Sequence, residues 1–123
     1  MKFPAHFPAQ CPPGTSFDAT GELFRFVDHK PPEASDFVSN HLLGKKYEKA
    51  KHCQACGLSI LTCEADVQLF LKAVPYFRKK FVAKGTVSPD WGKMEQTGRA
   101  PHHTWWVPDG KNPETIFAVI ETS

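Results

Sequence analysis

Hydrophobic and polar positions alternate with a period of two in several short segments of the chain. In the segment ELFRFVD, Leu23, Arg25 and Val27 share one side, and Phe24 and Phe26 share the other. Short apolar or alternating runs bounded by turn residues recur further along, at 56–62, 79–87, 93–98, 102–107 and 114–121. We expect each of these segments to form a strand.

Two further segments carry helical signals. In KPPEASDFVSNHLLG, Pro31 and Pro32 suit the approach and the first turn of a helix, and Gly44 suits its end. In CEADVQLFLKAV, an apolar stripe that includes Phe70 repeats with the helical period and stops at Pro75. We therefore expect one helix within 31–44 and a second within 63–74.

The order of these elements predicts an α+β fold, with two helices packed on a mainly antiparallel sheet. Four prolines, at positions 4, 8, 12 and 13, exclude a regular helix or a central strand from the first part of the chain. We expect residues 1–21 to form a Pro-rich extended arm. Residues 22–123 then form a single α+β domain, which is long enough for one hydrophobic core.

The composition and the N-terminal sequence indicate the cellular compartment in which the protein is expected. Hydrophobic residues make up 41% and charged residues 23%, close to ordinary globular usage. No apolar run approaches the roughly 18–20 residues of a membrane helix. The N-terminal sequence lacks the apolar region of a signal peptide. We expect a cytoplasmic protein with reduced cysteines, no membrane contact, and a monomeric or weakly dimeric state.

The net charge is only +2, but the middle of the chain is strongly basic. Residues 44–84 hold nine Lys and Arg against three acids, whereas the flanks hold six against ten. The basic segments interleave lysines with Tyr47, Tyr76 and Phe77, a pattern common in nucleic-acid binders. The sequence pI of about 8.4 is low for that class. A solvated basic surface, or a face for another anionic partner, is the alternative interpretation.

The segment HCQACG has the Cys-x-x-Cys spacing of a metal-binding turn. Cys53 and Cys56 would supply two of the four nitrogen or sulfur ligands that zinc requires. The remaining ligands would come from other cysteines or histidines: Cys11, Cys63, His52, His102 or His103. The alternative is that these thiols are only small buried hydrophobic groups. A zinc ion is therefore one candidate cofactor.

Arg25 lies in the middle of a predicted strand, on the side of apolar residues. An arginine in that position is rarely buried unless it pairs with an acid, here Asp36 or Glu121, or binds an anion. The chain contains no Gly-x-Ser-x-Gly turn, no Gly-rich phosphate loop and no His-Glu-x-x-His helix. No complete catalytic motif therefore accompanies Arg25.

Three polar residues follow one another along the chain: Arg25 on the first strand, Ser59 before a helix and Glu121 on the last strand. This order resembles the arginine–serine–glutamate order of ADP-ribosyltransferase-like domains. In that family the arginine and the serine position NAD, and the glutamate acts on the ribose. The chain lacks the family's doubled serine–threonine pattern and is short for that fold. The resemblance implies a nucleotide as a candidate cofactor, bound in a pocket formed by these three residues.

The segment HHTWWV places a histidine and a tryptophan on each face of a strand. His102 and Thr104 share a face with Trp106, whereas His103 shares the opposite face with Trp105. We expect Trp105 to face the core, because its face continues into a valine. Trp106 and His102 are then expected on an accessible surface that contacts a partner or ligand. The alternative is that the histidines only satisfy buried hydrogen bonds.

Two classes of function fit these observations. The first is a small cytosolic binding protein, such as an inhibitor, immunity or accessory factor, that contacts a protein partner through an aromatic and charged surface. The second is a small enzyme or nucleotide-binding domain with a pocket for a small anionic ligand. Its pocket residues would be Arg25, Ser59, His102, His103 and Glu121. Convergence of these five would favour the second class, whereas a flat aromatic face that includes Trp106 would favour the first.

Overall fold

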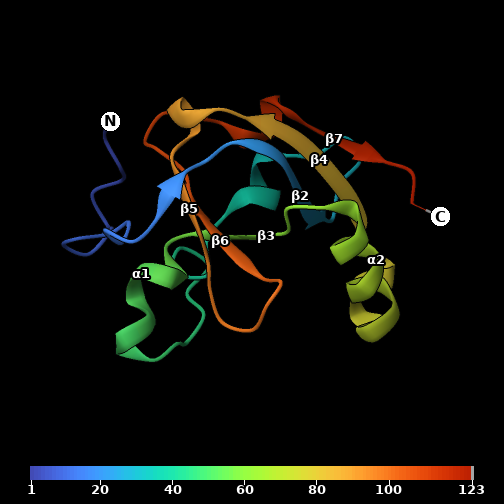
Figure 1. Cartoon of the computed structure of the whole chain (residues 1–123), viewed down its shortest axis with the longest axis horizontal. Helices are drawn as coiled ribbons and strands as arrows, with labels where there is room; N and C mark the ends of the chain where they lie inside the picture. The colour runs from blue at the N-terminus through green and yellow to red at the C-terminus, as the bar shows by residue number, and fades with distance from the viewer. Residues whose placement is uncertain (123) are drawn as a thin grey trace.

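Two antiparallel sheets and two helices make up the fold (Figure 1). The computed structural model describes residues 1–122. One sheet has the strand order β1 (Phe17–Asp18), β5 (Lys93–Gln96), β6 (His103–Trp106), β3 (Leu58–Ile60). The other has the order β2 (Gly21–Val27), β4 (Phe81–Val87), β7 (Phe117–Ile120). The fold is mixed α and β, mainly sheet, with two sheets where the sequence predicts one.

The alternating pattern of β2 buries side chains on both of its sides. Leu23 and Val27 contribute to the main core, which also contains Trp105 and Phe117. Phe24, on the opposite side, joins a second cluster with Leu61, Val67 and Val82. This strand pairs with β4 along its whole length, from Gly21 opposite Val87 to Val27 opposite Phe81. Other parts of the chain therefore pack on both sides of β2, the strand that carries Arg25.

The two adjacent tryptophans of β6 are both buried, Trp105 with 0% and Trp106 with 1% of its surface exposed. Each indole also donates a hydrogen bond of 2.8 Å to a backbone carbonyl, from Trp105 Nε1 to Trp91 and from Trp106 Nε1 to Cys53. The expectation of an accessible Trp106 is wrong, because the chain around Gly57 covers its face. A Cβ at Gly57 would lie only 3.1 Å from Trp106 Nε1.

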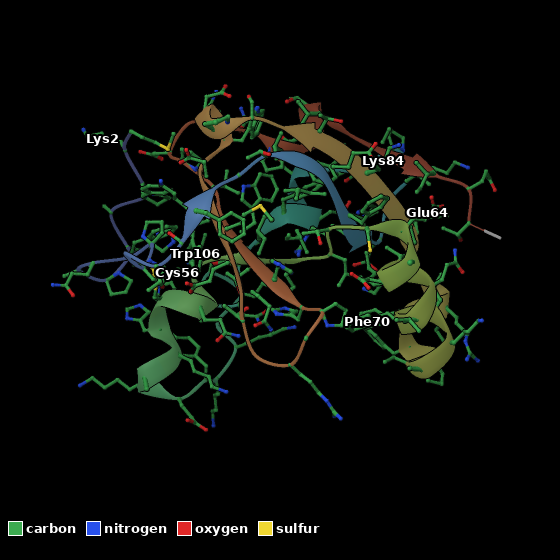
Figure 2. All side chains as sticks on the ribbon, viewed as in Figure 1. Lys2, Cys56, Glu64, Phe70, Lys84 and Trp106 are labelled. Atoms are coloured by element: carbon green, nitrogen blue, oxygen red, sulfur yellow. A yellow bond between two sulfur atoms is a disulfide. The ribbon has the colours of Figure 1, made fainter. Side chains whose placement is uncertain are left out.

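The helix expected within 63–74 is confirmed as α2 (Glu64–Ala73). Its Val67 is 1% exposed in the second cluster, whereas Phe70 is half-buried beside that cluster. Figure 2 shows Phe70 on the side of α2 that faces the rest of the molecule. A short 3-10 helix, Pro75–Lys79, follows α2. No helix among residues 1–122 has both the length and the apolar character needed to cross a membrane.

The expectation of a helix within 31–44 is wrong, because the chain forms only one 3-10 turn there, Ala34–Phe37. The carboxylate of Asp36 accepts hydrogen bonds from the backbone N–H groups of Asp28 and Glu33. Such local side-chain bonds compete with helical hydrogen bonding. Val38 is extended, with φ −106° and ψ 130°, so the turn cannot continue as a helix. The second helix is instead α1 (His52–Ala55), preceded by a 3-10 turn at Lys49–Lys51.

The first sixteen residues contain no strand and no helix. The chain then joins the edge of the first sheet, where Phe17 in β1 pairs with Met94 in β5. A disulfide links Cys11 to Cys53, at a sequence separation of 42. The N-terminal segment is thereby attached beside α1, and the assignment of residues 1–21 as an extended arm stays a prediction.

Candidate functional site

A groove of about 370 Å³ lies between β2, β3 and the segment that runs from α2 to Lys80. Its volume is within the range of roughly 300–1,000 Å³ typical of small-molecule sites. Three residues singled out from the sequence, Arg25, Ser59 and His102, line this groove together. They come from β2, from β3 and from the turn before β6. The pairing of β3 with β6, and an isolated bridge between Phe24 and Leu61 that links the two sheets, therefore bring these residues together.

Arg25 is held in the groove by two backbone carbonyl groups. Its Nε donates to the carbonyl of Asp36 at 2.9 Å, and its Nη1 donates to the carbonyl of Ser59 at 2.8 Å. Burial lowers the pKa of Arg25 to about 10, although the nearby Asp36 carboxylate opposes the shift. The guanidinium therefore keeps its charge at neutral pH. Of its five N–H donors, three have no partner among residues 1–122 and are available to a ligand.

Asp36 holds Arg25 through its backbone, while its side chain is used elsewhere. Burial of Asp36 favours a higher pKa for its carboxyl group. The hydrogen bonds from Glu33, Asp28 and His29 outweigh this effect and hold the pKa below its ordinary value. The carboxylate is thus charged at neutral pH and fixes the turn that carries the carbonyl bound by Arg25.

Ser59 and His102 form a side-chain hydrogen bond at the surface of the groove. The distance from Ser59 Oγ to His102 Nε2 is 2.9 Å. On the other side of the ring, His102 Nδ1 lies 3.2 Å from the carbonyl oxygen of Thr97. The same Nδ1 is also 3.1 Å from Thr97 Oγ1, a hydroxyl that can either donate or accept. In the tautomer that donates Nδ1–H to the Thr97 carbonyl, Nε2 can accept the Ser59 hydroxyl hydrogen, as in a serine paired with a general base.

The strand register explains why Ser59 and His102 meet. Ser59 is directly opposite Thr104 in the β3–β6 pair. His102 precedes Thr104 by two residues and therefore lies on the same face as Ser59. Thr97, whose Oγ1 is 2.7 Å from Thr104 Oγ1, anchors the turn on the other side. The imidazole is therefore held in one orientation.

The state of His102 leads to a prediction on pH. Burial lowers the pKa of His102, and the hydrogen bond to Thr97 only partly opposes that effect. The unfolded chain, with a histidine pKa of about 6.5, takes up a proton before the folded chain does. Stability should therefore be complete above that pH and fall as the pH decreases below it. Denaturant unfolding of the wild type and His102→Gln between pH 5 and pH 8 checks this prediction. Equal slopes against pH would contradict it.

Two lysines complete the charge of the groove. Lys80 donates a hydrogen bond to Asp28, which raises its pKa, and lies 5.2 Å from the centre of the Tyr76 ring. Lys45 makes no ion pair with any residue in the described part of the chain, and it remains exposed. No carboxylate is among the residues that line the groove. The lining therefore carries three cationic side chains, Arg25, Lys45 and Lys80, of which Lys80 is paired with Asp28 outside the lining.

Aromatic rings form the wall of the groove near α2. Phe26 and Phe77 stack with ring centroids 4.3 Å apart, and Phe70 lies 5.9 Å from Phe77. Tyr76 is 62% exposed at the rim. This wall offers a flat apolar surface beside the charged part of the groove.

The other residues singled out from the sequence lie elsewhere. Glu121 is fully exposed and faces Lys30, with Nζ and Oε1 3.9 Å apart. His103 Nδ1 is 2.9 Å from the carbonyl of Pro101, and neither His103 nor the buried Trp106 lines the groove. The structure therefore does not bring together the arginine–serine–glutamate set suggested by ADP-ribosyltransferase-like domains.

The groove lining also includes polar and aromatic residues that the sequence does not mark as site residues, among them Lys45, Lys80, Tyr76 and Phe77. They belong to the two basic segments in which lysines interleave with aromatic residues. The signal was therefore present in the sequence. It does not reveal that these two segments line one groove, because that depends on tertiary packing.

The cysteines differ from the sequence-based expectation. Cys53 is bonded to Cys11, and Cys56 and Cys63 are free thiols. The proposed zinc pair of Cys53 and Cys56 is therefore wrong, because a sulfur in a disulfide is not a thiolate ligand. The expectation that all four cysteines are reduced is wrong as well.

Comparisons of the chain with protein-family models, with curated proteins and with solved structures find no match. The geometry of the groove is therefore the evidence that bears on function.

Proposed function

We propose that the protein binds a small anionic ligand that carries a planar ring, of the nucleotide class, in the groove. The proposal rests chiefly on one observation: Arg25, Lys45 and Lys80 come from three separate segments to one groove with no carboxylate in its lining. It corresponds to the nucleotide-binding interpretation of the sequence, without Glu121.

The charge of the groove suits a phosphate group. Arg25 offers a rigid, partly desolvated guanidinium whose free N–H donors match phosphate oxygens in a bidentate geometry. Lys45 lines the same groove and has no acidic partner in residues 1–122. An anion could therefore pair with Lys45 without breaking an existing ion pair. A phosphate near these two residues would also face the Ser59 hydroxyl.

The aromatic wall suits the planar part of such a ligand. Tyr76 is exposed at the rim, and Phe77 is already stacked on Phe26. Stacking on aromatic side chains contributes about 1–3 kcal/mol per base in nucleic-acid complexes. The groove therefore offers one ligand both cationic side chains and an aromatic surface.

Titration with AMP, with adenosine and with inorganic phosphate, followed by amide chemical shifts, tests the proposal. We expect AMP to shift the resonances of groove residues and to bind more tightly than either fragment, because only AMP can contact both the cationic side chains and the aromatic wall. Binding should weaken as salt increases, since screening reduces the attraction of partly exposed charges. No shifts at the groove with any of the three probes would contradict the proposal.

Lys45 and Lys46 provide a matched pair of variants. Both are exposed, and only Lys45 lines the groove. We expect Lys45→Ala to weaken AMP binding about tenfold, equivalent to about 1.4 kcal/mol, and Lys46→Ala to leave it unchanged. Equal effects of the two substitutions would indicate non-specific attraction to the basic surface.

The Ser59–His102 hydrogen bond favours a second candidate function, hydrolysis or acyl transfer with Ser59 as nucleophile. His102 Nε2 is positioned to accept the hydroxyl proton while Thr97 holds the other ring nitrogen. Reaction with a fluorophosphonate probe tests this candidate. Labelling that is lost in Ser59→Ala and strongly reduced in His102→Gln would support it, and absence of labelling in the wild type would exclude it.

The interpretation as an inhibitor, immunity or accessory protein loses Trp106 from its expected contact surface, because Trp106 is buried. The absence of a complete catalytic motif from the sequence still favours this interpretation, which stays a prediction. A cytoplasmic location stays a prediction, which the thiol state of Cys11 and Cys53 in host material would test. Disulfides are rare in the cytosol because glutathione and thioredoxin keep thiols reduced.

A further inference from the structure

Three histidines and a cysteine gather beside α1, outside the lining of the groove. His41, His52 and Cys56 each offer one ligand atom, and these three atoms all lie within 4.8 Å of one another. The ring of His6 stacks on that of His41, with centroids 5.3 Å apart. We call these four residues the histidine–cysteine cluster.

The chain holds the cluster together through backbone and covalent bonds. His52 and Cys56 are four residues apart at α1 and therefore share one face of it. The N–H of His41 donates to the carbonyl of Ala55 at 3.0 Å, which ties the preceding turn to α1. The disulfide from Cys53 holds the segment that carries His6. Three separate segments are thus fixed at one place.

Two hydrogen-bond observations point to a metal ligand set. The Nε2 atom of His52 is buried and has no hydrogen-bond partner in residues 1–122. An unpaired buried nitrogen costs free energy, and coordination to a metal would remove that cost. The Nδ1 atom of His41 lies 2.7 Å from the hydroxyl of Tyr47. A metal-bound histidine usually donates its second ring N–H to such an oxygen, which leaves Nε2 of His41 free to coordinate.

We propose that the histidine–cysteine cluster is a zinc site in which His41, His52 and Cys56 are ligands and His6 supplies the fourth. Three nitrogens and one sulfur are a donor set that zinc prefers and that calcium and magnesium do not. Ligand atoms in a zinc tetrahedron are about 3.3–3.8 Å apart. The ligand atoms of His41, His52 and Cys56 must therefore close by about 1 Å around the ion. His6, which stacks on His41 outside this group of three, must move further and turn its ring toward the ion.

The surroundings of the cluster allow this movement. A cavity of about 170 Å³ is lined by His6 and Cys56, so an ion in it would reach these two of the four ligands directly. Figure 2 shows Cys56 close to Trp106 beside α1. Trp106 is 1% exposed and donates to the carbonyl of Cys53, so the base of the site is rigid. The movement would fall mainly on His6 and His41.

Titration of the intact protein with Co²⁺, without thiol reductants or chelators, tests the site. We expect one equivalent to bind with a tetrahedral visible spectrum and a thiolate-to-cobalt charge-transfer band, and Zn²⁺ to displace it. Cys56→Ser should lose the charge-transfer band, whereas Cys63→Ser, which removes the exposed free thiol, should retain it. Absence of one-to-one binding by the wild type, or a band that persists in Cys56→Ser, would overturn the proposal.

Two further variants examine the remaining assignments. Tyr47→Phe removes the hydroxyl that orients His41 and should weaken zinc binding by about 10–100-fold. His6→Gln should weaken it at least as much, because it removes a direct ligand. Unchanged affinity in His6→Gln would overturn the assignment of His6. The wild-type titration needs no substitution, so it decides the proposal even if a variant fails to fold.

Discussion

Replacing Trp105 by alanine is expected to lower the free energy of unfolding by about 3–5 kcal/mol. Trp105 is completely buried in the main core, where its ring lies 5.7 Å from that of Phe117 and 6.3 Å from that of Trp91. The substitution would leave a large cavity in the main core and deprive the carbonyl of Trp91 of its indole donor. Denaturant unfolding monitored by far-ultraviolet circular dichroism measures the change.

Trp106→Ala should have a similar effect, because Trp106 is as buried as its neighbour and also donates to a backbone carbonyl. Phe81, which is 42% exposed, supplies the control: Phe81→Ala should cost less than about 1 kcal/mol. A Trp106→Ala protein of wild-type stability would restore the sequence-based interpretation of an accessible face. It would contradict the covering of that face by the chain around Gly57.

The strands are predictable from local pattern because alternation reports burial directly. Residues 22–28 alternate between two apolar sets, and β2 buries one set in each core cluster. The pattern does not predict that the strands divide between two sheets. That division depends on which strands pair, and pairing is set by contacts between residues far apart in the sequence.

The helix expected within 31–44 shows where local signals fail. Its prolines and acidic residues are those of a helix start, and the structure uses Asp36 instead to bind the N–H groups of Asp28 and Glu33. The face of Trp106 shows a related failure. Period-two alternation separates the two faces of β6 but does not show that both are covered, one of them by a segment that begins some fifty residues earlier.

The candidate site is predictable in part. An arginine on the apolar side of a strand is unusual enough to mark Arg25, and Ser59 and His102 lie in the same groove. Only the order of residues along the chain points to Glu121, and that order does not determine its place in space: Glu121 lies exposed near Lys30. A residue type that is unusual in its local pattern, such as Arg25, is therefore a better guide to the site than the order of residues along the chain.

Removing the Cys11–Cys53 disulfide with the double substitution Cys11→Ser/Cys53→Ser is expected to lower the free energy of unfolding by about 4 kcal/mol. The bond closes a loop with a sequence separation of 42. In the chain-entropy treatment, cross-linking a loop of that length lowers the conformational entropy of the unfolded chain, which stabilises the folded state by about this amount. The substitutions should leave the bond from Trp106 to the backbone of residue 53 in place, because it does not involve the sulfur. Denaturant unfolding of the two proteins, without reductant, gives the difference.

Reductant separates loss of the disulfide from local damage by the substitutions. Adding reductant should destabilise the wild type to about the level of the double variant and leave the variant itself unchanged. Cys63→Ser is the matched control, because Cys63 is exposed and free, and its stability should equal that of the wild type both with and without reductant. If reductant leaves the wild type unchanged while the double variant is less stable, the loss comes from packing at the substituted positions. The N-terminal segment would then be held beside α1 by its contacts alone, since closure of the loop would contribute nothing measurable.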